Sequence, residues 1–227
     1  MGLAPAIATK DPATGELKGV GMDLARALAA RMGVNLQPVE YPSPPKTLEG
    51  LTAGAWDVAF LGIDPSRLGQ LDFSPPYLQV DYTYLIPPDS SVRDVSGADQ
   101  PGIRIAVTRN SVGDVALTRI LKRAELQRVD TAAAGMEGLR AGNFHVLASD
   151  RPNLLQLSEG LAGSRVLEDR FHSFSLAMVV PKGQAGRYAY ISEFIEEARA
   201  SGLVKQAIER AGLRGVQVAP AGNKGAQ

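Results

Sequence analysis

The sequence predicts an α/β fold with two lobes. The chain has 227 residues, a length that suits either one domain or two lobes of roughly 100 residues each. Short apolar runs of strand length alternate with segments in which apolar residues recur at helical spacing, as in α/β sheets. This alternation starts over after a polar connection that ends at Gly102. Two α/β units of similar plan therefore predict two lobes.

The first α/β cycle lies within residues 24–86. Leu24–Met32 carries apolar residues at helical spacing, and the following Gly33 suits a helix that ends in a left-handed cap. Val34–Tyr41 alternates apolar and polar residues, which favours a strand with one buried face. This order of elements predicts a sheet with parallel members. The remaining elements expected here are a helix over Leu48–Thr52 and strands over Val58–Ile63 and Tyr82–Ile86.

The second cycle begins after Pro87 and Pro88. We expect the two helices at the end of the chain to return to the first lobe. The first lobe would then comprise residues 1–86 and 181–227, and the second residues 87–180, with two hinge crossings in the strands Tyr82–Ile86 and Phe174–Val180. Open α/β sheets bind ligands beyond the carboxyl ends of their strands, so we expect a site in the cleft between the lobes. The further strands are expected over Ile103–Val107, Leu126–Val129 and Phe144–Ala148, and the helices over Val115–Ala124, Ala134–Ala141, Pro152–Glu159, Tyr188–Ser201 and Leu203–Ala211.

The composition excludes several classes of function. Lys and Arg number 24, as do Asp and Glu, and no block of like charge is present, which argues against a nucleic-acid or anionic-membrane partner. The absence of cysteine excludes thiolate metal sites and cysteine nucleophiles. With only His145 and His172 as histidines, we expect no His-dependent catalytic triad and no multi-His metal site, and we assign no metal ligands, whereas carboxylate chemistry remains open. No run of 18 apolar residues is present that would span a bilayer as a helix.

The start of the chain, Met1–Pro5, has neither the basic region nor the apolar core of a secretion signal. Taken by itself, this start indicates either a cytoplasmic protein or a protein whose signal has been removed.

The most informative segment runs from Trp56 to Tyr77. With the two residues before it, the chain reads GAWDVAFLGIDPSR over Gly54–Arg67 and continues with LDFSPPY over Leu71–Tyr77. It resembles the bacterial extracellular solute-binding proteins of family 3, the receptor subunits of polar amino-acid ABC importers. Three other segments resemble blocks of the same family, and together with the first they cover about residues 3–210 in family order. These blocks are TGELKGVGMDLA at Thr14–Ala25, GIRIAV at Gly102–Val107 followed by Asn110-Ser111, and AGNFHVLASD at Ala141–Asp150.

The resemblance implies a two-lobed periplasmic-binding-protein fold of type II. It also implies a receptor that closes its lobes on a small polar ligand, an amino acid or related carboxylate, without reacting with it. The expected partners are this small molecule and the membrane permease of an ABC transporter. We expect a periplasmic monomer without cofactor.

Arg67 is the candidate anchor for the ligand. A planar guanidinium a few residues beyond the carboxyl end of a strand suits bidentate binding of a carboxylate, and the matching Arg of the family holds the α-carboxylate of the ligand. The alternative is an ion pair with Asp64, which stands where the family has Thr. Asp64 would then neutralise Arg67 instead of contacting the ligand. Phe60 and Gly62, in the preceding strand, are further candidates, although a ring in a strand is more often part of the core.

The second lobe offers three more candidate ligand contacts. Asn110 and Ser111 precede an expected helix, where they suit an N-cap and also an anion bound at the positive helix end. The family uses this turn for the ligand carboxylate. Asp150 follows a strand and matches the acidic residue of the family that pairs with the ligand ammonium. Its alternative role is again a helix cap, before Pro152.

Two departures from the family leave the ligand undetermined. The loop between Asp57 and Arg67 is shorter than the usual family form. Near the amino terminus the family has aromatic rings that enclose the ligand side chain, where this chain has Ala4-Pro5-Ala6-Ile7. Phe60, Tyr41 and Tyr84 are the rings that remain as substitutes.

Two other interpretations remain. Some relatives of these binding proteins are dehydratases acting on cyclohexadienyl acids, a chemistry that needs a general acid with a raised pKa in a dry cleft. Asp64 and Asp150 are the only candidates for that acid. The second interpretation is that the chain is the ligand-sensing domain of a larger receptor, but no segment of the sequence supports a fused signalling domain.

Overall fold

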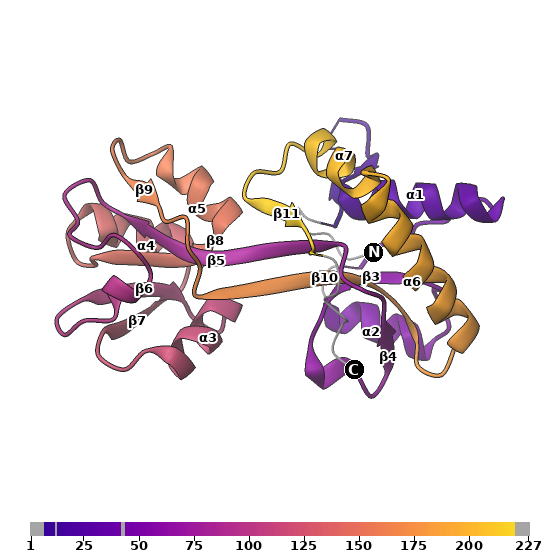
Figure 1. Cartoon of the computed structure of the whole chain (residues 1–227), viewed down its shortest axis with the longest axis horizontal. Coiled ribbons are helices and arrows are strands. Elements are labelled where there is room, and N and C mark those ends of the chain that lie inside the picture. The colour runs from indigo at the N-terminus through magenta and orange to yellow at the C-terminus, as the bar shows by residue number, and fades with distance from the viewer. Residues whose placement is uncertain (1–6, 12, 42–43, 221–227) are drawn as a thin grey trace. The chain divides into compact units, whose positions relative to one another are not determined.

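The computed structural model describes residues 7–11, 13–41 and 44–220, which form two compact units joined by shared strands. Unit 1 comprises the described residues up to Gln79, residues 175–213 and those from Gln217 onward, and unit 2 comprises residues 80–174 and 214–216. The strands and helices, most of which are labelled in Figure 1, are β1 Thr9–Lys10, β2 Leu17–Lys18, α1 Val20–Met32, α2 Pro44–Thr52, β3 Ala59–Gly62, the 3₁₀ helix η1 Pro65–Arg67, β4 Leu71–Phe73, β5 Leu78–Ile86, the 3₁₀ helix η2 Ser96–Ala98, β6 Arg104–Thr108, α3 Val112–Ile120, β7 Glu125–Val129, α4 Ala132–Arg140, β8 Val146–Asp150, α5 Arg151–Ser158, β9 Arg165–Val166, β10 His172–Pro181, α6 Ala185–Ala200, α7 Leu203–Arg210 and β11 Val216–Val218.

The chain passes between the units within two strands. β5 begins in unit 1 and enters unit 2 at Val80, and β10 returns the chain to unit 1 at Ser175. The sequence predicts that the chain changes lobe after residue 86 and again after residue 180. Residues 214–216, which we had assigned to the first lobe, group with unit 2, where Arg214 forms an ion pair of 2.9 Å with Glu159.

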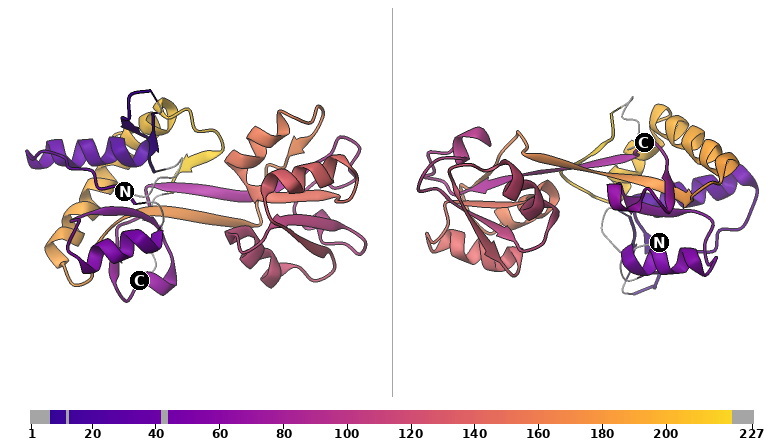
Figure 2. Two further views of the ribbon diagram at one scale, coloured as in Figure 1. Left: turned by 180° about the vertical axis from the view of Figure 1, so that it is seen from behind. Right: turned by 90° about the horizontal axis from the view of Figure 1, so that it is seen from below.

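Helix α1 ends where the sequence predicts. Gly33 adopts the left-handed conformation with φ of 67°, and its N–H donates to the carbonyls of Ala29 and Ala30. The helix begins at Val20, four residues before the predicted start, after Gly19 with φ of 136°. A Cβ at Gly19 would lie 2.8 Å from the carbonyl oxygen of Ile7, so only glycine fits there. In unit 1, α1 packs with α7 and α7 with α6, as both views of Figure 2 show.

The predicted strand over Val34–Tyr41 is wrong. Apart from a single bridge residue at Tyr41, the described backbone there forms no regular structure. Val34, Leu36 and Val39 are 54%, 37% and 38% exposed, so the apolar residues of the alternating pattern do not form a buried face. A strand is stabilised by cross-strand neighbours, and apolar alternation alone does not supply them.

The sheet pairs described in unit 1 are antiparallel, in contrast to the predicted parallel members. β10 pairs with β3 and with β4, in registers that place Ala177 opposite Leu61 and Val179 opposite Phe73. These four residues belong to one apolar cluster, against which Leu48 and Leu51 of α2 pack. Because the expected strand over residues 34–41 does not form, it supplies no parallel neighbour for β3.

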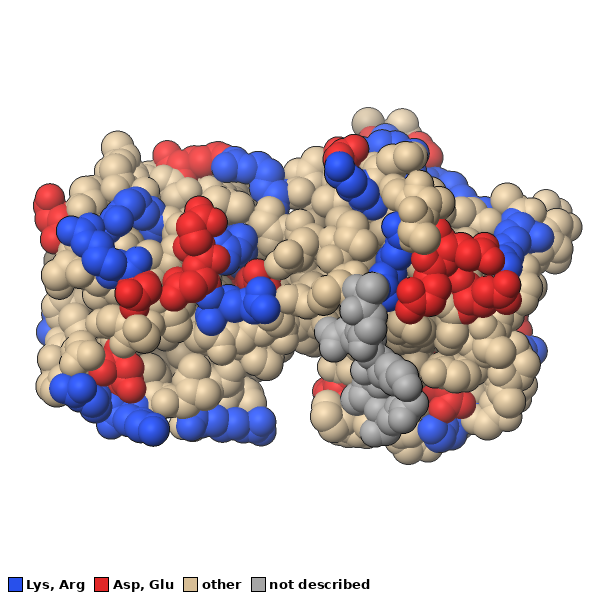
Figure 3. Space-filling model, viewed as in Figure 1, with Lys and Arg blue, Asp and Glu red and all other residues tan. Residues whose placement is uncertain are grey.

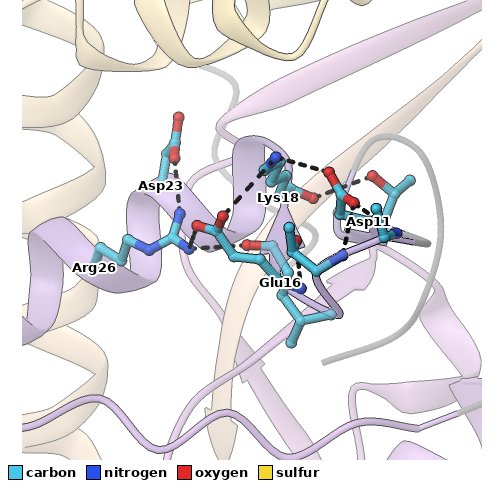
Figure 4. A network of polar contacts seen from close by, with 9 residues as sticks. Asp11, Glu16, Lys18, Asp23 and Arg26 are labelled. Carbon is cyan, nitrogen blue, oxygen red and sulfur yellow. Dashed lines mark hydrogen bonds and ion pairs between the residues drawn. The ribbon is translucent and has the colours of Figure 1, made fainter.

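The block that resembles TGELxG in the family builds a hairpin held to α1. In β1–β2, the Lys18 ammonium donates to Asp11 at 2.9 Å, and Arg26 of α1 donates to the Leu17 carbonyl at 2.9 Å and to Glu16 at 3.1 Å (Figure 4). Lys18 and two turn N–H groups lower the pKa of Asp11 to about 2. This block therefore has a structural role in unit 1.

Unit 2 contains the predicted parallel sheet. β6 pairs in parallel with β7 and with β8, and β5 lies antiparallel on the other side of β8. Successive side chains of these strands point to opposite faces. Ile105 and Val107 pack on the face covered by α3, whereas Ala106 packs on the face covered by α4 and α5. Two apolar clusters, one on each face, hold this sheet in place.

Helix α3 begins and ends earlier than the predicted Val115–Ala124. It starts at Val112 because Ser111 supplies a side-chain cap. It ends at Ile120, after which the Asp99 carboxylate accepts hydrogen bonds from the N–H groups of Lys122, Arg123 and Ala124 at 2.8 to 3.2 Å. Asp99 thus gives the backbone an alternative to further helical bonds.

Charges of both signs are distributed over the described surface. In Figure 3, groups of Lys and Arg and groups of Asp and Glu are scattered over the visible face with uncharged surface between them, and an acidic group gathers over α6, where Glu193, Glu196 and Glu197 are exposed. Within the described ranges, no cluster of His, Asp and Glu is arranged to hold a metal ion. Among the described residues, no helix combines the length and the apolar content that crossing a bilayer requires.

Candidate ligand-binding site

The predicted ligand contacts fall into two groups. Phe60, Gly62, Asp64 and Arg67 lie in unit 1, and Asn110, Ser111 and Asp150 lie in unit 2. In unit 1 only Asp64 and Arg67 follow the end of a strand, β3, whereas in unit 2 Asn110 and Ser111 follow β6 and Asp150 ends β8.

In unit 1, Asp64 caps the short helix η1. Its Oδ1 accepts from the Ser66 N–H at 2.9 Å and from the Ser66 hydroxyl at 2.8 Å. These two donors, with a smaller contribution from the Arg67 charge, hold the pKa of Asp64 below its usual value. The carboxylate is therefore ionised at neutral pH and is engaged mainly by Ser66.

Arg67 keeps most of its donors. Its Nη1 donates to the Gly62 carbonyl at 3.1 Å, and its Nη2 lies 3.8 Å from Asp64 Oδ2, too long for a hydrogen bond. The side chain is 20% exposed. A guanidinium has five N–H groups, of which this one is used within the described residues. The Gly62 carbonyl thus orients Arg67 while leaving N–H groups for a carboxylate.

Phe60 lies inside unit 1. It is 2% exposed and contacts the buried Tyr77 edge-to-face, with ring centroids 5.8 Å apart. Of the other rings considered as substitutes, Tyr84 is 1% exposed and stacks on Phe171. The amino-terminal segment that lacks the family's rings lies outside the described residues, except for the buried Ile7.

In unit 2, Ser111 and Asn110 form the turn before α3. The Ser111 hydroxyl accepts from the Asp114 N–H at 3.1 Å, so Ser111 is the N-cap. Asn110 has φ of 58°, a left-handed conformation that non-glycine residues seldom adopt. Its N–H donates to Asp114 Oδ2 at 2.9 Å. The turn before α3 is thus fixed by its own hydrogen bonds.

Asp114, which sequence reasoning missed, is the centre of this turn. The carboxylate is buried and also accepts from Arg128 Nε at 3.1 Å and from the Thr118 hydroxyl at 3.2 Å. Burial by itself would raise the pKa of Asp114, but the Asn110 N–H and the Arg128 guanidinium outweigh it and lower the pKa. An acidic residue three positions after a serine cap is a recognisable signal, although Arg128 is supplied only by the fold.

Asp150 caps α5, the alternative role that its position suggested. Its Oδ1 accepts from the Asn153 N–H at 3.0 Å. Its Oδ2 accepts from the Ser149 hydroxyl at 3.3 Å, a longer contact. Because each carboxylate oxygen has two acceptor positions, capping leaves room for a ligand donor.

Tyr82 is the second residue that sequence reasoning missed. It lies directly opposite Asp150 in the antiparallel β5–β8 register. Its ring also lies beside α3, because a Cβ added to Gly113 would be 3.3 Å from Tyr82 Cδ1. Burial raises the pKa of Tyr82 to about 12, with a contribution from the Asp150 charge. One ring therefore borders both the start of α3 and the Asp150 carboxylate.

The chain is similar in sequence and in fold to known proteins. The sequence pattern of bacterial extracellular solute-binding proteins, family 3, matches residues 3–212. A glutamine-binding protein of Geobacillus stearothermophilus is 23% identical over 166 residues, which are 71% of this chain and 63% of that protein. The chain thus spans less than two thirds of the length of this relative.

Two solved structures share the fold. An ancestral cationic amino-acid solute-binding protein has a TM-score of 0.71 and 21% identity over 90% of each chain. A binding component of an ABC transporter from Wolinella succinogenes DSM 1740, complexed with lysine, has a TM-score of 0.71 and 24% identity over 92% of this chain and 93% of that one. The fold is the α/β, two-lobed fold of type II periplasmic binding proteins, as predicted. From the match over residues 3–212, the chain belongs to the bacterial extracellular solute-binding proteins, family 3.

Proposed function

We propose that this chain is the ligand-binding receptor of an ABC importer and that it binds a free amino acid or a related carboxylate. Its partners are the small molecule and a membrane permease, and it acts in the periplasm as a monomer. The relatives named above bind glutamine and lysine, which supports an amino acid as ligand.

One observation in unit 2 carries the proposal beyond family membership. The start of α3 and the carboxylate of Asp150 border the same ring, that of Tyr82. The first N–H groups of a helix have no intrahelical acceptor and attract anions. At the start of α3, the Asp114 N–H donates to the Ser111 hydroxyl. The N–H groups of Val112 and Gly113 are therefore the donors that a carboxylate would meet. Asp150 supplies the charge that an ammonium requires, and the two groups together suit a zwitterion.

Unit 1 contributes Arg67 to the proposed binding of the carboxylate. A carboxylate that accepts two parallel N–H bonds from a guanidinium gains both energy and orientation. The 3.8 Å separation from Asp64 supports Arg67 as a ligand contact, because Asp64 is engaged at shorter distance by Ser66. We expect removal of Arg67 to weaken binding at least tenfold, a loss of about 1.4 kcal/mol or more.

We further propose that the ligand is bound and not transformed. A dehydratase needs a general acid whose pKa is raised, whereas the pKa of Asp64 is lowered by the Ser66 donors. Incubation of the pure protein with prephenate and arogenate, followed by chromatography of the products, tests this point. Turnover that is lost in Asp150→Asn would contradict it.

The binding proposal is tested by thermal denaturation with 5 mM L-glutamine, L-lysine, L-arginine or L-glutamate. A ligand at about 100 times its Kd adds about 2.7 kcal/mol of stability, which raises the Tm of a chain of this size by roughly 5–11 °C. Because a tenfold loss of affinity removes about 1.4 kcal/mol of the stabilisation, Arg67→Ala and Asp150→Asn should each reduce the rise by about half or more. Asparagine is also a good N-cap, so the second variant removes the charge and keeps the helix start.

The matched controls are Arg187→Ala and Asp130→Asn, which alter an exposed arginine in unit 1 and an exposed aspartate in unit 2. Both controls should keep the full rise in Tm. If none of the four amino acids raises the Tm of the wild-type chain, the proposal of an amino-acid receptor is wrong.

A further inference from the structure

We propose that Tyr82 is a specificity-determining residue whose ring binds the α-ammonium of the ligand together with Asp150. This inference rests on the proposed function, because it assumes that an amino acid binds to residues of unit 2. The position of Tyr82, its exposure and its neighbours support it independently of the relatives.

The register places Tyr82 and Asp150 on the face of the sheet that α3 covers. Tyr82 is opposite Asp150, and two residues further along the strand Tyr84 is opposite Ala148. Tyr84 and Ala148 pack in the same apolar cluster as Leu117 of α3. Side chains two residues apart on a strand point to the same face. Tyr82 and Asp150 therefore continue the α3 face beyond the edge of the core.

Exposure separates the two tyrosines of this strand. Tyr84 is 1% exposed and is a core residue. Tyr82 is half-buried, and it is the one residue in β5 that is not fully buried. The rest of the strand is buried, whereas the Tyr82 ring is partly exposed next to a carboxylate. Core packing alone does not account for this exposed ring.

The neighbours of Tyr82 hold its ring in place. Gly113 has no side chain, and a methyl group there would approach Tyr82 Cδ1 to 3.3 Å. On other sides the centroids of Phe171 and His172 lie 6.3 and 6.1 Å from that of Tyr82. A ring that is already ordered loses little entropy when a ligand packs on it.

The chemistry of this pair favours a cation. An aromatic face attracts an ammonium group, and the attraction grows as water is removed. A carboxylate beside the ring adds charge of the opposite sign to the ammonium. A neutral amide in place of the ammonium would lose both interactions, so the pair discriminates free amino acids from N-acylated ones.

The inference is tested by isothermal titration calorimetry, which measures the Kd of L-glutamine, L-lysine and L-arginine for the wild type. The same three ligands are titrated into four variants, Tyr82→Phe, Tyr82→Leu, Asp150→Asn and the Tyr82→Leu/Asp150→Asn double variant.

For the amino acid that binds the wild type most tightly, Tyr82→Leu should weaken binding about tenfold and Tyr82→Phe less than about twofold, because phenylalanine keeps the ring face. The double variant should bind at least about threefold better than the product of the two single losses predicts, because both residues act on one ammonium. Tyr188→Leu, which removes an exposed tyrosine of α6, is the control and should bind like the wild type.

Gly113→Ala tests the same inference without altering Tyr82. Alanine favours the helix by up to about 1 kcal/mol, so the Tm should not fall, while the displaced ring should weaken binding about threefold. This variant decides the matter if Tyr82→Leu does not fold.

The inference is overturned if Tyr82→Leu binds within twofold of the wild type, if Tyr82→Phe is as weak as Tyr82→Leu, or if the two single losses simply multiply. Each of these results would leave the proposed function intact. Failure of all three amino acids to bind the wild type would overturn the proposed function and this inference together.

Discussion

Replacement of Asp114 by alanine is expected to destabilise unit 2 by about 3 kcal/mol. The buried carboxylate accepts hydrogen bonds from Asn110, Thr118 and Arg128 at 2.9, 3.2 and 3.1 Å. A hydrogen bond to a charged group contributes roughly 1.5–3 kcal/mol. Arg128 is 36% exposed and Asn110 is exposed, so when the carboxylate is removed, water forms hydrogen bonds with their freed donors and offsets part of the loss. A further few tenths of a kcal/mol come from the favourable position of an anion in the first turn of α3.

The pH dependence of this loss follows from the lowered pKa of Asp114. A group whose pKa is lower in the folded chain stabilises it fully above the unfolded pKa, near 3.9, and loses this contribution as pH falls through the folded pKa. The difference between the wild type and Asp114→Ala should therefore be constant from about pH 7 to pH 5 and should shrink below about pH 4.

Urea denaturation followed by far-UV circular dichroism measures both quantities. Fluorescence of Trp56, the single tryptophan, reports unit 1 and shows whether the units unfold together. Asp130→Ala is the control, because Asp130 is 92% exposed and its partner Arg109 lies 3.9 Å away, so a change under about 0.5 kcal/mol is expected. A loss under about 1 kcal/mol for Asp114→Ala, or a loss that stays constant down to pH 3, would refute the assignment of Asp114 as the centre of the turn.

Two further predictions concern packing. Within the described residues, the Tyr77 hydroxyl is buried without a hydrogen-bond partner, so Tyr77→Phe should leave the free energy of unfolding unchanged or raise it by about 1 kcal/mol; a fall of that size in urea denaturation would show that the hydroxyl is satisfied in solution. A methyl group on Gly135 would lie 2.7 Å from Leu147 Cδ1, so Gly135→Ala should cost about 1–3 kcal/mol despite the helical preference of alanine. Gly186→Ala in α6, where nothing lies within 4 Å of the added Cβ, is its control and should be neutral or slightly stabilising, and equal stability of both variants would contradict the packing argument.

Local patterns predicted the helices and the parallel sheet of unit 2. Gly33 ends α1 and Ser111 caps α3 through interactions within a few residues, so they can be recognised in a single segment. The strand expected over Val34–Tyr41 failed for the opposite reason. Its pattern was local, but the sheet neighbour that stabilises a strand has to come from elsewhere in the chain.

The sequence by itself determined the family, the order of most elements, and the polar residues at the strand ends, including Arg67, Ser111 and Asp150. These features are carried by motifs, periodicity and caps, which need no information from distant residues. Only the tertiary structure decided that Arg128 donates to Asp114 and that Phe60 is buried against Tyr77. It also decided that Tyr82 lies opposite Asp150, because the register between two strands 68 positions apart depends on how they pair in the folded sheet, and no local pattern specifies that pairing.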